Sequence, residues 1–61
     1  MTTIINNLPD YYTAYPFLVA RRVDDDWWFY GSYNTRERAA DVAWREDGEV
    51  FTSDEVIKGD L

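Results

Sequence analysis

The sequence predicts a small α+β domain, in which one helix packs on one face of an antiparallel or mixed three-stranded sheet. Two segments rich in β-forming residues flank a short run of aspartates, which is typical of a hairpin. An alanine-rich segment with helical spacing and a third short β-forming segment complete a ββαβ order. The 61 residues have room for one domain, which we divide into an arm over 1–16 and a core over 17–61.

Residues 1–16 predict an extended arm that lies on the rest of the domain. The β-branched residues of 2–5 favour a short strand, and 6–10 have the composition of a turn. The tyrosines that follow before Pro16 are Tyr11, Tyr12 and Tyr15. We expect their rings to be partly buried and their hydroxyls to remain in water.

The hairpin is the clearest signal in the chain. Residues 17–23 and 27–33 predict its strands, and 24–26 its loop. A three-residue loop sets Val23 opposite Trp27, whereas a two-residue loop at 25–26 sets Val23 opposite Trp28. Because a one-residue change of register exchanges the faces of one strand, the sequence leaves open which tryptophan is in the core.

Bulky rings occur on both faces of the second strand, whichever register holds. Alternation puts Trp27, Phe29 and Tyr33 on one face and Trp28 and Tyr30 on the other. One helix covers only one face of a small sheet. The other set of rings therefore needs cover from the arm, from a second copy of the chain or from a partner.

The helix is predicted over residues 35–46. Asn34 suits its N-cap, Glu37 can complete a capping box, and Gly48 suits the left-handed residue that ends a helix. The polar arc of the helix consists of Glu37, Arg38, Asp41 and Arg45. The rest of the surface is mostly Ala39, Ala40, Val42, Ala43 and Trp44, and its alanines allow a close approach to the sheet.

The last residues predict a third strand and a short C-terminal helical turn. Residues 49–52 are predicted to form the strand. Residues 52–55 have the pattern of a helix start, with Thr or Ser as the cap and acids in the first turn. Val56 and Ile57 would then pack in one helical turn, which Gly59 would end.

Catalytic and metal chemistry find no support in this composition, so we expect no enzyme activity, no cofactor and no metal site. The chain has no Cys and no His, which removes the usual zinc ligands and nucleophilic triads. Ser32 and Ser53 have no visible base partner. The aspartates of 24–26 lie at a predicted hairpin tip, in contact with water rather than in the apolar setting that a catalytic acid needs, and they lack the spacing of a calcium loop.

The net charge of -6, from twelve acids and six bases, limits the class of partner. Such a surface repels nucleic acid and anionic membranes and attracts basic proteins. No stretch approaches the ~20 apolar residues of a membrane span, and the N-terminus does not have the pattern of a secretory signal. We therefore expect a cytoplasmic protein that binds neither nucleic acid nor membrane.

The aromatic strands and the acidic turns are the candidate binding residues, because interface centres are enriched in Trp, Tyr and Arg. The predicted apolar anchor is Trp28, Tyr30 and Arg22. The predicted charged rim is Asp24, Asp25 and Asp26. The plainer alternative is that the rings serve only the core and the acids only the solvated surface.

In size, acidity and lack of catalytic residues the chain resembles small phage-encoded inhibitors, such as anti-CRISPR proteins and uracil-DNA glycosylase inhibitors. The resemblance implies an inhibitor from a phage or mobile element that imitates DNA and occupies the basic, nucleic-acid-binding surface of a host protein. The alternative is a structural module that forms a homodimer through its exposed aromatic sheet face.

Overall fold

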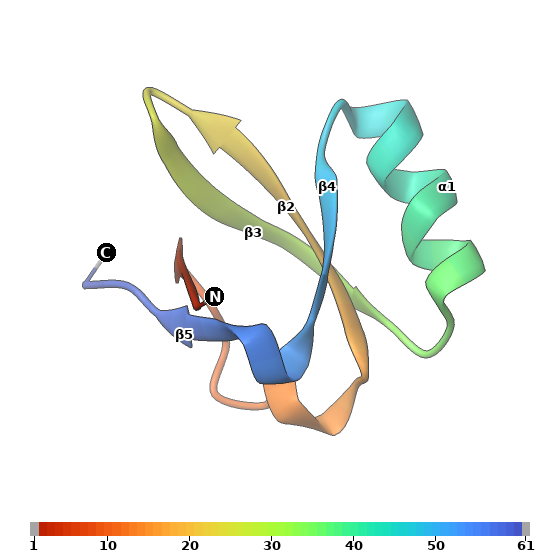
Figure 1. Cartoon of the computed structure of the whole chain (residues 1–61), viewed down its shortest axis with the longest axis horizontal. Helices are drawn as coiled ribbons and strands as arrows, with labels where there is room; N and C mark the ends of the chain where they lie inside the picture. Colours follow the sequence, from red (N-terminus) through yellow and green to blue (C-terminus); the bar gives the residue numbers. More distant parts are fainter. Residues whose placement is uncertain (1, 61) are drawn as a thin grey trace.

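Five strands form one mixed sheet, and a helix packs on part of one of its faces (Figure 1). The computed structural model describes residues 2–60, so the ends of the predicted domain, Met1 and Leu61, lie outside it. The elements are β1 (Thr3–Asn6), η1 (Tyr12–Ala14), β2 (Phe17–Val23), β3 (Asp26–Tyr33), α1 (Arg36–Glu46), β4 (Glu49–Thr52), η2 (Ser53–Glu55) and β5 (Val56–Lys58), where η marks a 3-10 turn. The α+β class is confirmed, but the three-stranded ββαβ sheet is wrong.

The first additional strand is β1, which the sequence analysis placed in an arm. It lies between β3 and β5 in the sheet order β4-β2-β3-β1-β5 and runs parallel to both neighbours. A short strand was expected here from the β-branched residues. Its pairing was not, because parallel neighbours lie far away in sequence and leave no local turn signal.

The second additional strand is β5. The helix start predicted at Thr52 is present as a capping box, in which the Thr52 N–H donates to the Glu55 carboxylate over 2.8 Å. It starts only one 3-10 turn, η2. The predicted helical turn through Val56 and Ile57 is wrong, because these β-branched residues pair with β1 instead.

The hairpin loop has two residues, but it lies one residue earlier in the chain than the predicted two-residue loop at 25–26. It consists of Asp24 and Asp25, whose φ angles are 50° and 71°, and Val23 pairs with Asp26. Two-residue hairpin loops of this kind require positive φ at both central residues, and aspartate tolerates that region better than most side chains. Both predicted registers are therefore wrong, and Trp27 lies opposite Arg22.

A β-bulge in β3 changes which rings share a face. Val19 pairs with Gly31 and Ala20 with Phe29, so Tyr30 is the extra residue. The alternation shifts there, and Tyr33 shares a face with Trp28 rather than with Trp27, as was predicted. A Cβ at Gly31 would lie 2.6 Å from the Tyr33 hydroxyl, so a larger residue there would have to displace the end of this side chain.

The helix begins one residue later than predicted, at Arg36. Thr35, not Asn34, is the N-cap, and its hydroxyl accepts a hydrogen bond from the Arg38 N–H over 3.2 Å. The residues that α1 buries are Ala39, Val42 and Ala43. Ala40 and Trp44, from the same apolar arc of the sequence, remain exposed.

Gly48 is not the left-handed residue that ends the helix, as was predicted. Asp47 adopts the left-handed conformation with φ 57°, and the Gly48 N–H donates to the Ala43 carbonyl over 2.8 Å. Glycine is required at 48 for a different reason. A Cβ there would lie 2.8 Å from the backbone oxygen of Ala20.

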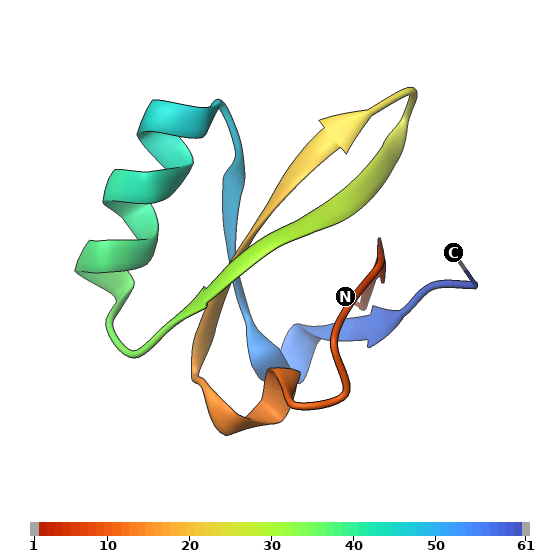
Figure 2. The same cartoon turned by 180° about the vertical axis from the view of Figure 1, so that it is seen from behind.

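Two apolar clusters lie on opposite faces of the sheet. The closed-face cluster contains Ile5, Leu8, Leu18, Ala20 and Val56, with Tyr12, Trp27, Phe29 and Phe51 packed against it. Every strand contributes to it, which requires the sheet to curl, and the view from behind shows β1 and β5 bent away from β4 (Figure 2). The helix-face cluster contains Val19, Ala39, Val42 and Ala43, with Phe17, Tyr33 and Val50.

Candidate protein-binding surface

The helix covers only half of the face on which it packs. The covered half comprises the parts of β2, β3 and β4 that contribute Phe17, Val19, Tyr33 and Val50 to the helix-face cluster. Toward the hairpin tip, the same face continues across four strands without a helix above it. We call this part the open half; its residues are Ile4, Arg21, Val23, Asp26, Trp28 and Ile57.

The strand register brings the residues of the open half together. Arg21 pairs with Trp28, and Trp28 also pairs with Asn6. Ile4, two residues before Asn6, shares its face and pairs with Ile57 on β5. Four neighbouring strands therefore contribute to one surface.

The open half is apolar and partly exposed. Ile4, Val23 and Ile57 are 57%, 48% and 46% exposed, and Trp28 is half-buried. Tyr30, at the bulge, is also exposed and borders this surface. Single exposed apolar residues are ordinary, but a group of them on adjacent strands is typical of a surface that contacts another molecule.

Acidic residues lie at the hairpin end of the open half. Asp24 and Asp25 form the exposed hairpin tip, and Asp26 lies within the surface itself. Glu49 of β4 pairs with Ala20 of β2, so its side chain is on the opposite face of the sheet from the open half. Asp60 follows the far edge strand, β5. An apolar surface with carboxylates at one end complements a partner that is apolar in the middle and basic at its margin.

Most of the predicted partner-binding residues lie together, and one does not. Trp28, Tyr30 and the three aspartates of 24–26 lie in or beside the open half. Arg22 lies on the opposite face, where its guanidinium carbon is 5.4 Å from the centre of the Trp27 ring. The basic residue beside Trp28 is Arg21.

Sequence reasoning missed the aliphatic part of this surface. Ile4 and Ile57 come from segments that were expected to form an arm and a helical turn. The signal in the sequence was the two β-branched pairs, Ile4-Ile5 and Val56-Ile57. In the structure, one residue of each pair is buried and the other is exposed. Only the pairing of β1 with β5 shows that the two exposed isoleucines are neighbours.

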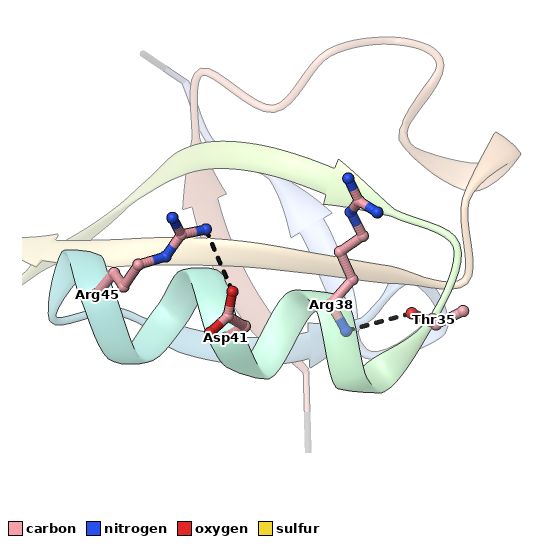
Figure 3. A network of polar contacts seen from close by, with 4 residues as sticks. All are labelled: Thr35, Arg38, Asp41 and Arg45. Atoms are coloured by element: carbon pink, nitrogen blue, oxygen red, sulfur yellow. Dashed lines mark hydrogen bonds and ion pairs between the residues drawn. The ribbon is translucent and has the colours of Figure 1, made fainter.

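A shallow groove of about 580 Å³ lies between α1 and β3. It is lined by Tyr33, Thr35, Glu37, Arg38, Asp41, Val42 and Arg45. Figure 3 shows the side chains of Arg38 and Arg45 extending from α1 toward β3, and Arg45 forms an exposed ion pair with Asp41 at 3.3 Å. Burial, followed by the neighbouring Tyr30, raises the pKa of the Tyr33 phenol, while the two arginines oppose the shift. The groove is polar and carries both signs of charge.

Within residues 2–60, no three or more carboxylates gather where they could hold a metal ion. The Ser32 hydroxyl oxygen is buried without a hydrogen-bond partner in this part of the chain. An exposed ion pair between Asp10 and Lys58 joins the loop after β1 to β5, and Lys58 lowers the pKa of the Asp10 carboxyl through its hydrogen bond and its charge. No helix of the described residues is long and apolar enough to cross a membrane.

Comparison with protein-family models, with curated proteins and with solved structures finds no match for this chain. Function is therefore inferred from the surface of the molecule itself.

Proposed function

We propose that this chain is a non-enzymatic protein-binding domain whose open half contacts a basic surface of another protein. The group of exposed apolar residues beside the acidic hairpin tip carries the proposal. Ile4, Ile57 and Trp28 provide apolar contact area at the centre. Asp24, Asp25 and Asp26 provide the charged margin, which accelerates association with a basic partner.

The proposed task is inhibition of a nucleic-acid-handling protein, as in the phage or mobile-element inhibitors that the composition resembles. A net charge of -6 on a small rigid domain opposes binding to nucleic acid and favours the groove that nucleic acid occupies. Carboxylates at the tip of a firmly paired hairpin imitate phosphates at fixed positions, without the cost of ordering a loop.

The alternative is a homodimer formed through the open half, which its apolar residues favour. Two copies would, however, bring two aspartate tips and a total charge of -12 (twice -6) into one assembly. A basic partner neutralises these charges, whereas a second copy does not. Light scattering over a wide concentration range separates the two proposals, because the homodimer predicts a doubled mass.

The test of the main proposal is capture of partners from a cell lysate at low and high salt, followed by their identification and by titration of the purified partner. We expect Ile4→Ser, in the open half, to weaken binding about tenfold, in keeping with a residue at an interface centre. Tyr11→Ser is the matched control, because Tyr11 is 59% exposed but lies outside the open half.

The triple change of Asp24, Asp25 and Asp26 to Asn should retain the fold and slow association at low salt. Retention of partners that ignores salt, or equal affinity of the Ile4 and Tyr11 variants, would contradict the proposal.

A further inference from the structure

Trp44 is the most exposed large apolar side chain of residues 2–60, with 86% of its surface in water. It lies on the side of α1 that points away from the sheet, since it follows the buried Val42 by about 200° around the helix axis. A helical side chain leans over the preceding turn, and the residue four positions before Trp44 is the small Ala40. The indole ring is therefore left bare by its own helix.

Carboxylates flank this ring. Asp41 lies three residues before Trp44 and Glu37 two turns before it, both on the same side of the helix, and Asp47 follows at the left-handed C-cap. The cation among them is Arg45, which pairs with Asp41 in an exposed contact of 3.3 Å. We call this surface, Glu37, Asp41, Trp44 and Asp47, the helix crest, and it has a net negative charge.

We propose that the helix crest binds an arginine side chain of a basic protein segment, so that the molecule has a second contact surface besides the open half. The guanidinium plane stacks on the Trp44 ring while its N–H groups donate to the carboxylates beside the ring. The inference rests on the proposed function for the class of partner. A flat aromatic ring beside carboxylates favours arginine over lysine, because only arginine both stacks and donates in one plane.

The helix crest and the open half are separate surfaces. Figure 1 places α1 and the tip of the β2–β3 hairpin on opposite sides of the molecule. The helix crest can therefore take a different segment of the partner from the open half, and its negative charge disfavours a second copy of this chain there.

The test uses a blocked tetra-arginine peptide as the probe, titrated at low salt into the isotope-labelled chain while the indole N–H resonances are followed. We expect a saturable shift of the Trp44 indole resonance that persists in the Asp24/Asp25/Asp26→Asn variant. Trp44→Ala should lower the affinity for the peptide about fivefold, the size of a cation–π contact at an exposed site. Tetra-lysine should bind more weakly, and a tetra-glutamate peptide should cause no shift.

The outcome separates this inference from the proposed function. A Trp44 resonance that stays in place while other resonances saturate, or equal shifts with arginine and lysine peptides, would overturn the inference. The proposed function would survive that result if Ile4→Ser still weakened partner binding. Trp44 is so exposed that its replacement should leave the free energy of unfolding within about 0.5 kcal/mol of the wild type, which makes loss of fold a poor explanation.

Discussion

Ile4 and Ile5 are neighbours in one short strand and have opposite environments. Ile5 is fully buried in the closed-face cluster, whereas Ile4 is 57% exposed in the open half. The same contrast recurs on β5, where Val56 is buried and Ile57 is exposed. The two faces of these strands thus have different roles: one holds the curled sheet together, and the other presents apolar surface to water.

The largest expected effect is on the buried member of this pair. Ile5→Ala should destabilise the domain by about 3 kcal/mol, because it removes a fully buried side chain and leaves a cavity. Ile4→Ala should change the free energy of unfolding by less than about 0.5 kcal/mol. Urea unfolding measures both, and Ile5→Val, at about 1 kcal/mol, is a milder substitute if the alanine variant does not fold. Equal losses at positions 4 and 5 would end the distinction between the two faces.

The next largest effects are expected at the two glycines beside the covered half, where an added Cβ would make a close contact. Gly48→Ala should cost about 2 kcal/mol, because its Cβ would meet the backbone oxygen of Ala20 at 2.8 Å. Gly31→Ala should cost less, about 1 kcal/mol, since its close contact is the end of the Tyr33 side chain, which can rotate. Thermal unfolding compares them, and the reverse order would show that the ring of Tyr33 is held more rigidly than the backbone of β2.

A gain of stability is expected at the hairpin tip, beside the open half. Asp25→Gly should stabilise the domain by about 0.5–1 kcal/mol, because glycine adopts the φ of 71° found there without a steric cost. Asp26→Gly is the control and should destabilise, since residue 26 is a paired strand residue. If Asp25→Gly is more stable but binds the partner more weakly, the aspartate serves binding rather than folding. A loss of stability in this variant would contradict the two-residue turn.

The smallest effect is the pH dependence that Tyr33 contributes at the edge of the covered half. Its folded-state pKa is raised above the ordinary 10.0, mainly by burial, so the folded protein keeps the phenol proton longer than the unfolded chain does. This contribution is fully present below pH 10 and is lost as the pH rises through the folded-state pKa. Tyr33→Phe should lack this decline when unfolding is measured between pH 9 and pH 11. An identical decline in both proteins would assign the alkaline transition to other groups.

The local elements could be predicted from the sequence, because their signals lie within a few residues. The strands of the hairpin, the helix α1 and the helix start at Thr52 all have such signals. The parallel pairing of β1 with β3 and β5 has none, so the chain ends were assigned to an arm and a helical turn. The bulge at Tyr30 also escaped prediction, because one extra residue changes the face of Tyr33 without changing its β-propensity.

Only part of the candidate surface could be predicted, again because local signals can be recognised in the sequence and distant pairing cannot. Trp28, Tyr30 and the aspartate tip follow from composition and hairpin alternation. The place of Arg22 depends on the exact loop, and a two-residue turn at Asp24 and Asp25 put it on the other face. The exposure of Trp44 depends on where the helix axis lies, which three small buried side chains, Ala39, Val42 and Ala43, determine only once the sheet is present.

The most direct measurement follows the isoleucine and valine methyl resonances of the labelled chain as the partner isolated by salt-sensitive capture is added. We predict shifts concentrated at Ile4, Val23 and Ile57, with Ile5 and Val19 nearly unchanged, and no shift when the chain alone is concentrated. Shifts absent from these three residues, or the same shifts without any partner, would contradict the assignment of the open half to a basic protein.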